Sequence, residues 1–182
     1  ANIEVSAEGK AKGKTFKSDS VKLYPNDLKS NTPVTLRFEK DKINKYVEEK
    51  EKEENSLKNK LSRFFNKYTS ALNEASFGNN FASVSKYLTP GTKNYDNIRY
   101  QIQTGQGVQN WYQSPQVMDV STEGVHVYAK VLNLNSQGVW VTSTYKLQDV
   151  NHKSGQIPEE DDLKIISYKA VSYTHLTLPT KR

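Results

Sequence analysis

The stretch Leu57-Lys-Asn-Lys-Leu61-Ser-Arg-Phe64-Phe65-Asn-Lys-Tyr68-Thr-Ser-Ala-Leu72 places its apolar residues at the spacing of one helix face. Its opposite face carries basic side chains, and we interpret these as the solvated side: Lys58, Lys60, Arg63 and Lys67. The stretch therefore predicts an amphipathic helix that packs against another layer.

The residues that follow predict two shorter helical elements. Gly78-Asn-Asn80 ends the first helix, a short apolar segment runs over residues 81–88, and Thr89-Pro90-Gly91 breaks it. A further helix is expected from about Thr92 to Gln103, with Tyr95, Ile98 and Ile102 on one side.

Beyond Gly105 the apolar period changes from helical spacing to alternation. Four runs alternate, at residues 116–120, 125–131, 138–147 and 163–168, and short turn sequences separate the first three. The sequence therefore predicts an α+β domain over residues 57–170, with about three helices packed on a curved antiparallel meander.

Two segments precede this domain. Residues 1–42 show short alternating stretches, including Val34–Phe38, and are interpreted as the C-terminal part of a small β-module. Residues 43–56 are a mixed-charge run without an apolar stripe, and we interpret them as a charged helical linker.

The last residues, 171–182, are interpreted as foreign to the natural protein. Translated back into codons, Val171-Ser-Tyr-Thr-His-Leu-Thr-Leu-Pro-Thr180 matches a sequencing-library adapter in one frame. The alternative is a native β-like tail. Together with the absence of a starting methionine, this match predicts an open reading frame cut at both sides.

Composition excludes several functional classes. The 182 residues contain no cysteine, so disulfide scaffolds, thiolate metal sites and cysteine nucleophiles are excluded. No apolar run is long enough to cross a membrane. The net charge is +6, but the basic residues are spread along the chain instead of clustering with aromatic residues, and we expect no nucleic-acid partner.

No set of residues has the spacing of a catalytic, metal or cofactor site, and none is predicted. His126 lies opposite the valine face of its predicted strand, and alternation places Asp119 toward water. The acidic run Glu159-Glu-Asp-Asp162 lacks the spacing of a calcium loop, and we interpret it as a solvated hairpin tip.

Two groups of residues remain as candidate contact sites. Aromatic residues near the predicted helix–sheet interior either close the core or contact a ligand such as a carbohydrate: Tyr95, Tyr100, Trp111, Trp140 and Tyr145. Alternation in Lys10-Ala-Lys12-Gly-Lys14 predicts three ammonium groups on one side of a strand. They suit an anionic polymer, or else a solvated, edge-protecting face.

The run Phe64–Phe81, followed by Val84–Thr92 and Tyr95, resembles the NTF2-like C-terminal domain of the TcaA family. These are teicoplanin-resistance-associated membrane proteins of Gram-positive bacteria. The resemblance implies a cone-shaped fold, a location on the extracellular face of the cell membrane, and an N-terminal membrane anchor that this sequence lacks. It also implies a role in envelope integrity and the response to glycopeptide antibiotics.

We therefore expect a non-enzymatic envelope module that binds wall polymer or an envelope protein. The alternative is a small-molecule isomerase or hydrolase that uses the pocket of the cone, since related folds host such enzymes.

Overall fold

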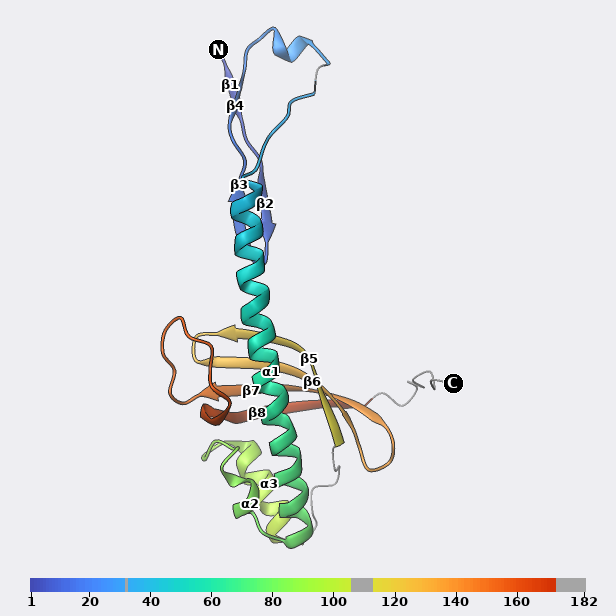
Figure 1. The fold of residues 1–182 in the computed structure, drawn as a ribbon. Helices are drawn as coiled ribbons and strands as arrows, with labels where there is room; N and C mark the ends of the chain where they lie inside the picture. Colours follow the sequence, from blue (N-terminus) through green and yellow to red (C-terminus); the bar gives the residue numbers. More distant parts are fainter. Residues whose placement is uncertain (32, 106–112, 173–182) are drawn as a thin grey trace. The chain divides into compact units, whose positions relative to one another are not determined.

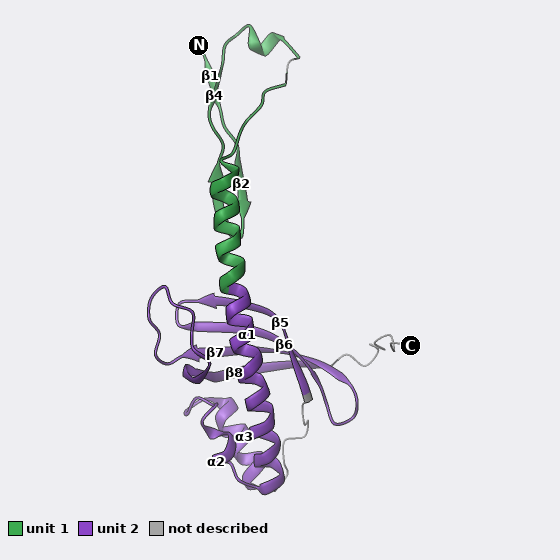
Figure 2. Cartoon of the chain, viewed as in Figure 1, with its two compact units in different colours: residues 1–53 green, residues 54–182 purple. Residues whose placement is uncertain are grey.

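A computed structural model describes residues 1–31, 33–105 and 113–172. The chain divides into two compact units, residues 1–53 and 54–182 (Figure 2), and each is described by itself below.

The first unit contains two small antiparallel sheets. Strand β1 (Ile3–Val5) pairs with β4 (Val21–Leu23), and β2 (Glu8–Ala11) pairs with β3 (Lys14–Lys17). A short 3-10 helix, η1, follows at Asp27–Lys29. Phe16 of β3 packs edge-on against Tyr46, with ring centroids 5.7 Å apart, so the hairpin shares an aromatic contact with the first helical turns.

The strand predicted at Val34–Phe38 does not form, and this part of the prediction is wrong. Instead, the amide of Arg37 donates to the Asp19 carboxylate at 2.7 Å, and the amide of Asp19 donates to the Arg37 carbonyl at 2.9 Å. The Asp19 carboxylate thus accepts the backbone hydrogen bond that a carbonyl of a neighbouring strand would accept in a β-ladder.

Helix α1 runs from Lys40 to Gly78 and joins the predicted linker and the predicted amphipathic helix into one element. Its buried residues begin only at Leu57, where the apolar stripe begins. The preceding turns are helical but contain no buried residue. Within them Lys50 forms an ion pair with Glu53 at 3.3 Å, as expected for helix residues three positions apart.

The second unit adds two helices and one sheet to α1 (Figure 1). Helix α2 spans Ala82–Ser85, and α3 spans Lys93–Gln103. Thr92 caps α3, because its hydroxyl oxygen accepts a hydrogen bond from the Tyr95 amide at 3.2 Å.

All four predicted strands form, and they pair in chain order as an antiparallel meander. They are β5 (Gln113–Glu123), β6 (His126–Leu134), β7 (Trp140–Asp149) and β8 (Leu163–Ser172), with a 3-10 helix, η2, at Glu160–Asp162. Register shifts in β5 and between β7 and β8 interrupt the ladders, as bulges that bend strands do. Strand β8 includes Val171 and Ser172, so the segment predicted to be foreign begins inside it.

The core lies between the apolar stripe of α1 and one face of the sheet, here called the inner face. Leu61 and Phe65 are almost fully buried, as are Val127, Leu147 and Ile165 of the inner face. Tyr87–Thr89 covers part of the edge of β8. There the Ile165 amide donates to the Tyr87 carbonyl at 2.8 Å, and the Thr89 amide donates to the Ile165 carbonyl at 2.9 Å.

None of the helices among the described residues combines the length and the apolar character that a membrane crossing requires.

Replacing Phe65 with alanine tests the central packing contact. Phe65 is 1% exposed, so we expect F65A to lower the free energy of unfolding by about 3–5 kcal/mol, measured by urea denaturation. The matched control on the same helix is F77A, because Phe77 is 68% exposed and its truncation is expected to cost less than about 1 kcal/mol. Equal losses for the two variants would contradict this description of the core.

Candidate functional site

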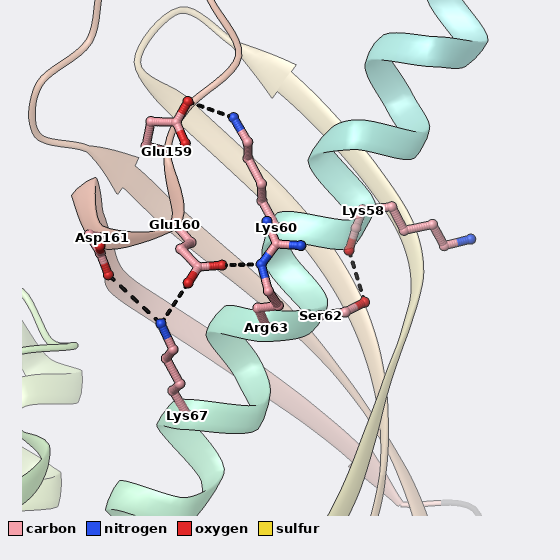
Figure 3. Close-up of polar contacts among 8 residues, drawn as sticks. All are labelled: Lys58, Lys60, Ser62, Arg63, Lys67, Glu159, Glu160 and Asp161. Carbon is pink, nitrogen blue, oxygen red and sulfur yellow. Dashed lines mark hydrogen bonds and ion pairs between the residues drawn. The ribbon is translucent and has the colours of Figure 1, made fainter.

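A cluster of ion pairs connects the outer side of α1 to the segment before β8 (Figure 3). Lys60 reaches Glu159 at 2.8 Å, while Arg63 and Lys67 reach the two oxygens of Glu160, each at 2.6 Å. The three cations lie three and four residues apart, so they share one helix face. The predicted solvation holds for Glu159 and Asp161, whose side chains are 70% and 91% exposed. It is wrong for Lys60 and Glu160, which are 16% and 18% exposed and form ion pairs that the sequence did not predict.

Electrostatics in this cluster are governed by Glu160. Hydrogen bonds from Lys67 and then Arg63 favour its ionised form and hold the pKa of Glu160 below its ordinary value. The hydrogen bond to Glu160 likewise raises the pKa of Lys67. Both groups thus remain charged over a wider pH range than they would alone.

Tyr87 lies beside this cluster and is held on two sides. Its carbonyl accepts the hydrogen bond from Ile165, and its ring packs edge-on against Phe64 and Tyr68, with centroid distances of 5.7 and 6.1 Å. Lys86 places its ammonium nitrogen 5.1 Å from the centroid of the Tyr87 ring. The tyrosine is therefore positioned by the core but remains half-buried.

Two hollows meet at Lys67, Lys86 and Tyr87. One has a volume of about 200 Å³ and extends toward Glu160 and Leu163. The other has a volume of about 430 Å³ and runs between α1 and α2, past the hydroxyls of Ser70 and Ser83. We call the two hollows together the Tyr87 groove.

The Tyr87 groove offers the contacts that a hydroxyl-rich anionic ligand uses. An aromatic ring can pack on a sugar or polyol, serine hydroxyls can exchange hydrogen bonds with it, and an ammonium group can bind phosphate or carboxylate. Lys67 is neutralised by Glu160, whereas Lys86 makes no ion pair with any described residue. Lys164, which lines the first hollow, also makes no ion pair with any described residue, so Lys86 and Lys164 are the cations in the groove that are available to an anion.

The aromatic residues predicted as pocket contacts lie in different environments. Tyr145 is buried in the core, with its ring centroid 4.7 Å from that of Phe65, whereas Trp140 lies on the opposite face of β7 and is half-buried. Tyr95 packs edge-on against Phe81 at 5.0 Å, and Tyr100 is 62% exposed. Trp111 lies outside the described residues.

The remaining polar groups near the sheet do not converge on one point. Asn133 and Ser143 are buried on the inner face, and each has a side-chain atom without a hydrogen-bond partner among the described residues. His126 is half-buried on the face opposite the valines, as predicted. His152 lies 3.6 Å from the buried carboxyl of Asp149 at the end of β7, beside a third hollow of about 660 Å³.

Lys10, Lys12 and Lys14 do not lie on one side of a strand, so that prediction is wrong. Lys12 and Gly13 both have positive φ, 47° and 78°, and form the tight turn that reverses the chain between β2 and β3. Because Lys14 pairs with Ala11 and Lys10 pairs with Thr15, Lys10 and Lys14 point to opposite faces. Lys14 lies over the rings of Phe16 and Tyr46, at 5.3 and 4.9 Å.

Sequence reasoning did not identify Lys86 or Tyr87 as site residues. Tyr87 was expected in a short apolar segment, and nothing local showed that its ring would lie between two hollows. Complementary charges were a usable signal, because one helix face carries the basic residues Lys60, Arg63 and Lys67 and the run Glu159–Asp162 consists only of acidic residues.

Residues 57–169 match the family described as the TcaA protein NTF2-like domain. The "Membrane-associated protein TcaA" of Staphylococcus epidermidis is 42% identical over 153 residues, which are 84% of this chain and 33% of that protein. The Staphylococcus aureus protein of the same name, from strain JH9, is 42% identical over 147 residues, 81% of this chain and 32% of that protein. The chain thus spans about a third of the length of these relatives. No solved structure matches it significantly.

Acidification tests the role of Glu160. Because its pKa is lowered in the folded state, its contribution to stability is present above the ordinary carboxyl pKa of 4.5 and is lost as pH falls through the folded-state value. We expect E160Q to have a lower melting temperature than the wild type at pH 7, and this difference to vanish in strong acid. The control E74Q removes an exposed glutamate of α1 and should show no such pH dependence. A melting-temperature difference that persists below pH 2 would contradict the role given to Glu160.

Proposed function

Because the chain belongs to the TcaA family through its NTF2-like domain, we propose that it is a non-enzymatic extracellular module of a membrane-anchored Gram-positive envelope protein. Its meander and helices form the cone of that fold class. It binds an anionic wall polymer through the Tyr87 groove, and through that contact the whole protein contributes to envelope integrity and the glycopeptide response.

The observation that carries this proposal is the pairing of an unneutralised ammonium group with a rigidly held aromatic ring. Lys86 has no acidic partner among the described residues, and Tyr87 is fixed by Phe64, Tyr68 and β8. A groove that is already shaped loses little conformational freedom when a flexible polymer enters it.

An envelope protein is the other candidate partner.

The first unit offers further candidate contacts for an anionic polymer. Lys10 and Lys12 are exposed, and Lys14 also remains a candidate, although its ammonium group lies over two aromatic rings. Substitution of these lysines tests their contribution to binding separately from that of the Tyr87 groove.

Catalysis is less well supported than binding. An enzyme of this fold would need titratable groups that converge in the interior between helices and sheet. The buried polar groups described there include Asn133 and Ser143, which are neutral, whereas Asp149 and His152 lie at the end of β7. The relatives are also named as membrane-associated proteins and not as enzymes.

Co-sedimentation with purified Gram-positive cell walls tests the proposal. We expect the full chain to bind intact walls at low salt, to dissociate as salt rises, and to bind poorly to walls stripped of anionic polymers. The walls should retain about two- to tenfold less of the variant K86E, because this substitution reverses the charge of the unpaired lysine that lines both hollows.

The matched control is K93E, which reverses an exposed lysine of α3 outside the groove and should bind like the wild type. Absence of retention at low salt would refute wall binding. If K86E and K93E lost wall retention equally, the binding site would lie away from the Tyr87 groove.

A further inference from the structure

The face of the sheet that points away from the core, here called the outer face, carries unpaired cations. The register places Lys130 of β6, Thr144 of β7 and Lys169 of β8 in one row across three strands. In the next row, Tyr128 lies opposite Lys146. Neighbouring strands are about 5 Å apart, so the backbones of Lys130 and Lys169, which lie two strands apart in one row, are separated by about 10 Å.

These lysines differ from the cations of α1 in their surroundings. Lys60, Arg63 and Lys67 are each paired with a carboxylate, whereas Lys130, Lys146 and Lys169 make no ion pair with any described residue. Even Asp119, which lies opposite Lys130 in the register, forms no ion pair with it in the described structure. Among the described residues, carboxylates thus neutralise the cations of α1 but not the outer-face lysines.

The outer face is apolar at the end next to these lysines. Leu134 and Trp140 are direct cross-strand neighbours, and Leu132 lies opposite Thr142 in the row between them and Lys130. All three apolar side chains are half-buried. Solvated faces of antiparallel sheets are usually polar, so this end departs from the common pattern.

Helix α1 crosses the inner face, and the apolar stripe of the helix packs there (Figure 1). The described helical residues of the core cluster pack with inner-face residues such as Val127, Ala129 and Val131. Among the described residues, the helical core cluster packs on the inner face, and the outer face presents a basic area beside an apolar area.

We propose that the outer face docks a protein partner that presents carboxylates beside apolar side chains. Charge complementarity requires an acidic partner for Lys130, Lys146 and Lys169. The apolar end favours a protein over an inorganic polyphosphate, because a polyphosphate chain has no carbon atoms to cover Leu134 and Trp140. A second copy of this chain is disfavoured, since it would bring another set of unpaired lysines to the interface.

The test uses a rhodamine-labelled synthetic peptide of alternating glutamate and leucine, titrated with the full chain and followed by fluorescence anisotropy. The triple variant K130E/K146E/K169E should bind the peptide at least about tenfold more weakly than the wild type. A peptide of alternating glutamate and serine should also bind more weakly, because it keeps the charge but lacks the apolar contact. K86E should bind the first peptide like the wild type, which separates this surface from the Tyr87 groove.

The matched control K52E/K93E/K153E reverses three exposed lysines that belong to no strand of the sheet, and it should bind within about twofold of the wild type. Thermal melts of both triple variants check that they are folded, and K130Q/K146Q/K169Q should show an intermediate loss of binding. Three results would each overturn the proposal. The first is an equal loss of peptide affinity in the two charge-reversal variants. The second is binding of polyphosphate at the same lysines as tightly as the peptide. The third is a dimer in sedimentation velocity that disappears in K130E/K146E/K169E.

Discussion

The packing of Phe64, Phe65 and Tyr68 against the sheet and against Tyr87 is the contact on which the second unit depends. The Phe65 ring lies 4.7 Å from that of Tyr145, which joins α1 to the inner face, while Phe64 and Tyr68 hold Tyr87. One aromatic cluster therefore stabilises the fold and shapes the Tyr87 groove. A loss of packing in the core would move the groove as well, so stability and binding are coupled in this domain.

The fold uses its lysines in two ways. On α1 they bind the acidic segment before β8, which lies close to a hundred residues further along the chain, and they fix that segment beside the groove. Lys86 and the outer-face lysines have no such partner among the described residues. Surface ion pairs contribute little to stability individually, so the pairs on α1 matter mainly because they position Glu160 and its neighbours. The unpaired lysines carry the charge that is available for binding.

The sequence predicted the elements well because their signals are local. The stripe from Leu57 to Leu72 and the alternation of the four strands each depend on a short window, and the α+β arrangement of helices and antiparallel meander follows from them. The wrong predictions concern residues whose partners are distant in the chain or follow a tight turn. Val34–Phe38 has no partner strand to pair with. Lys12 and Gly13 form the tight turn that reverses the chain between β2 and β3. Glu160 forms ion pairs with Arg63 and Lys67, which lie far from it in the sequence. The Tyr87 groove was unpredictable for the same reason, since three separate segments build it.

In the proposed ligand site, a tyrosine ring fixed by the core lies beside an available lysine. Its most direct test is NMR chemical-shift mapping of the isotope-labelled full chain during titration with short, purified fragments of anionic wall polymer. We expect saturable shifts at Lys86, Tyr87, Ser70 and Ser83, with little change at Lys130, Lys146 and Lys169. Shifts confined to the outer face or to the first unit, or none at millimolar fragment, would contradict it.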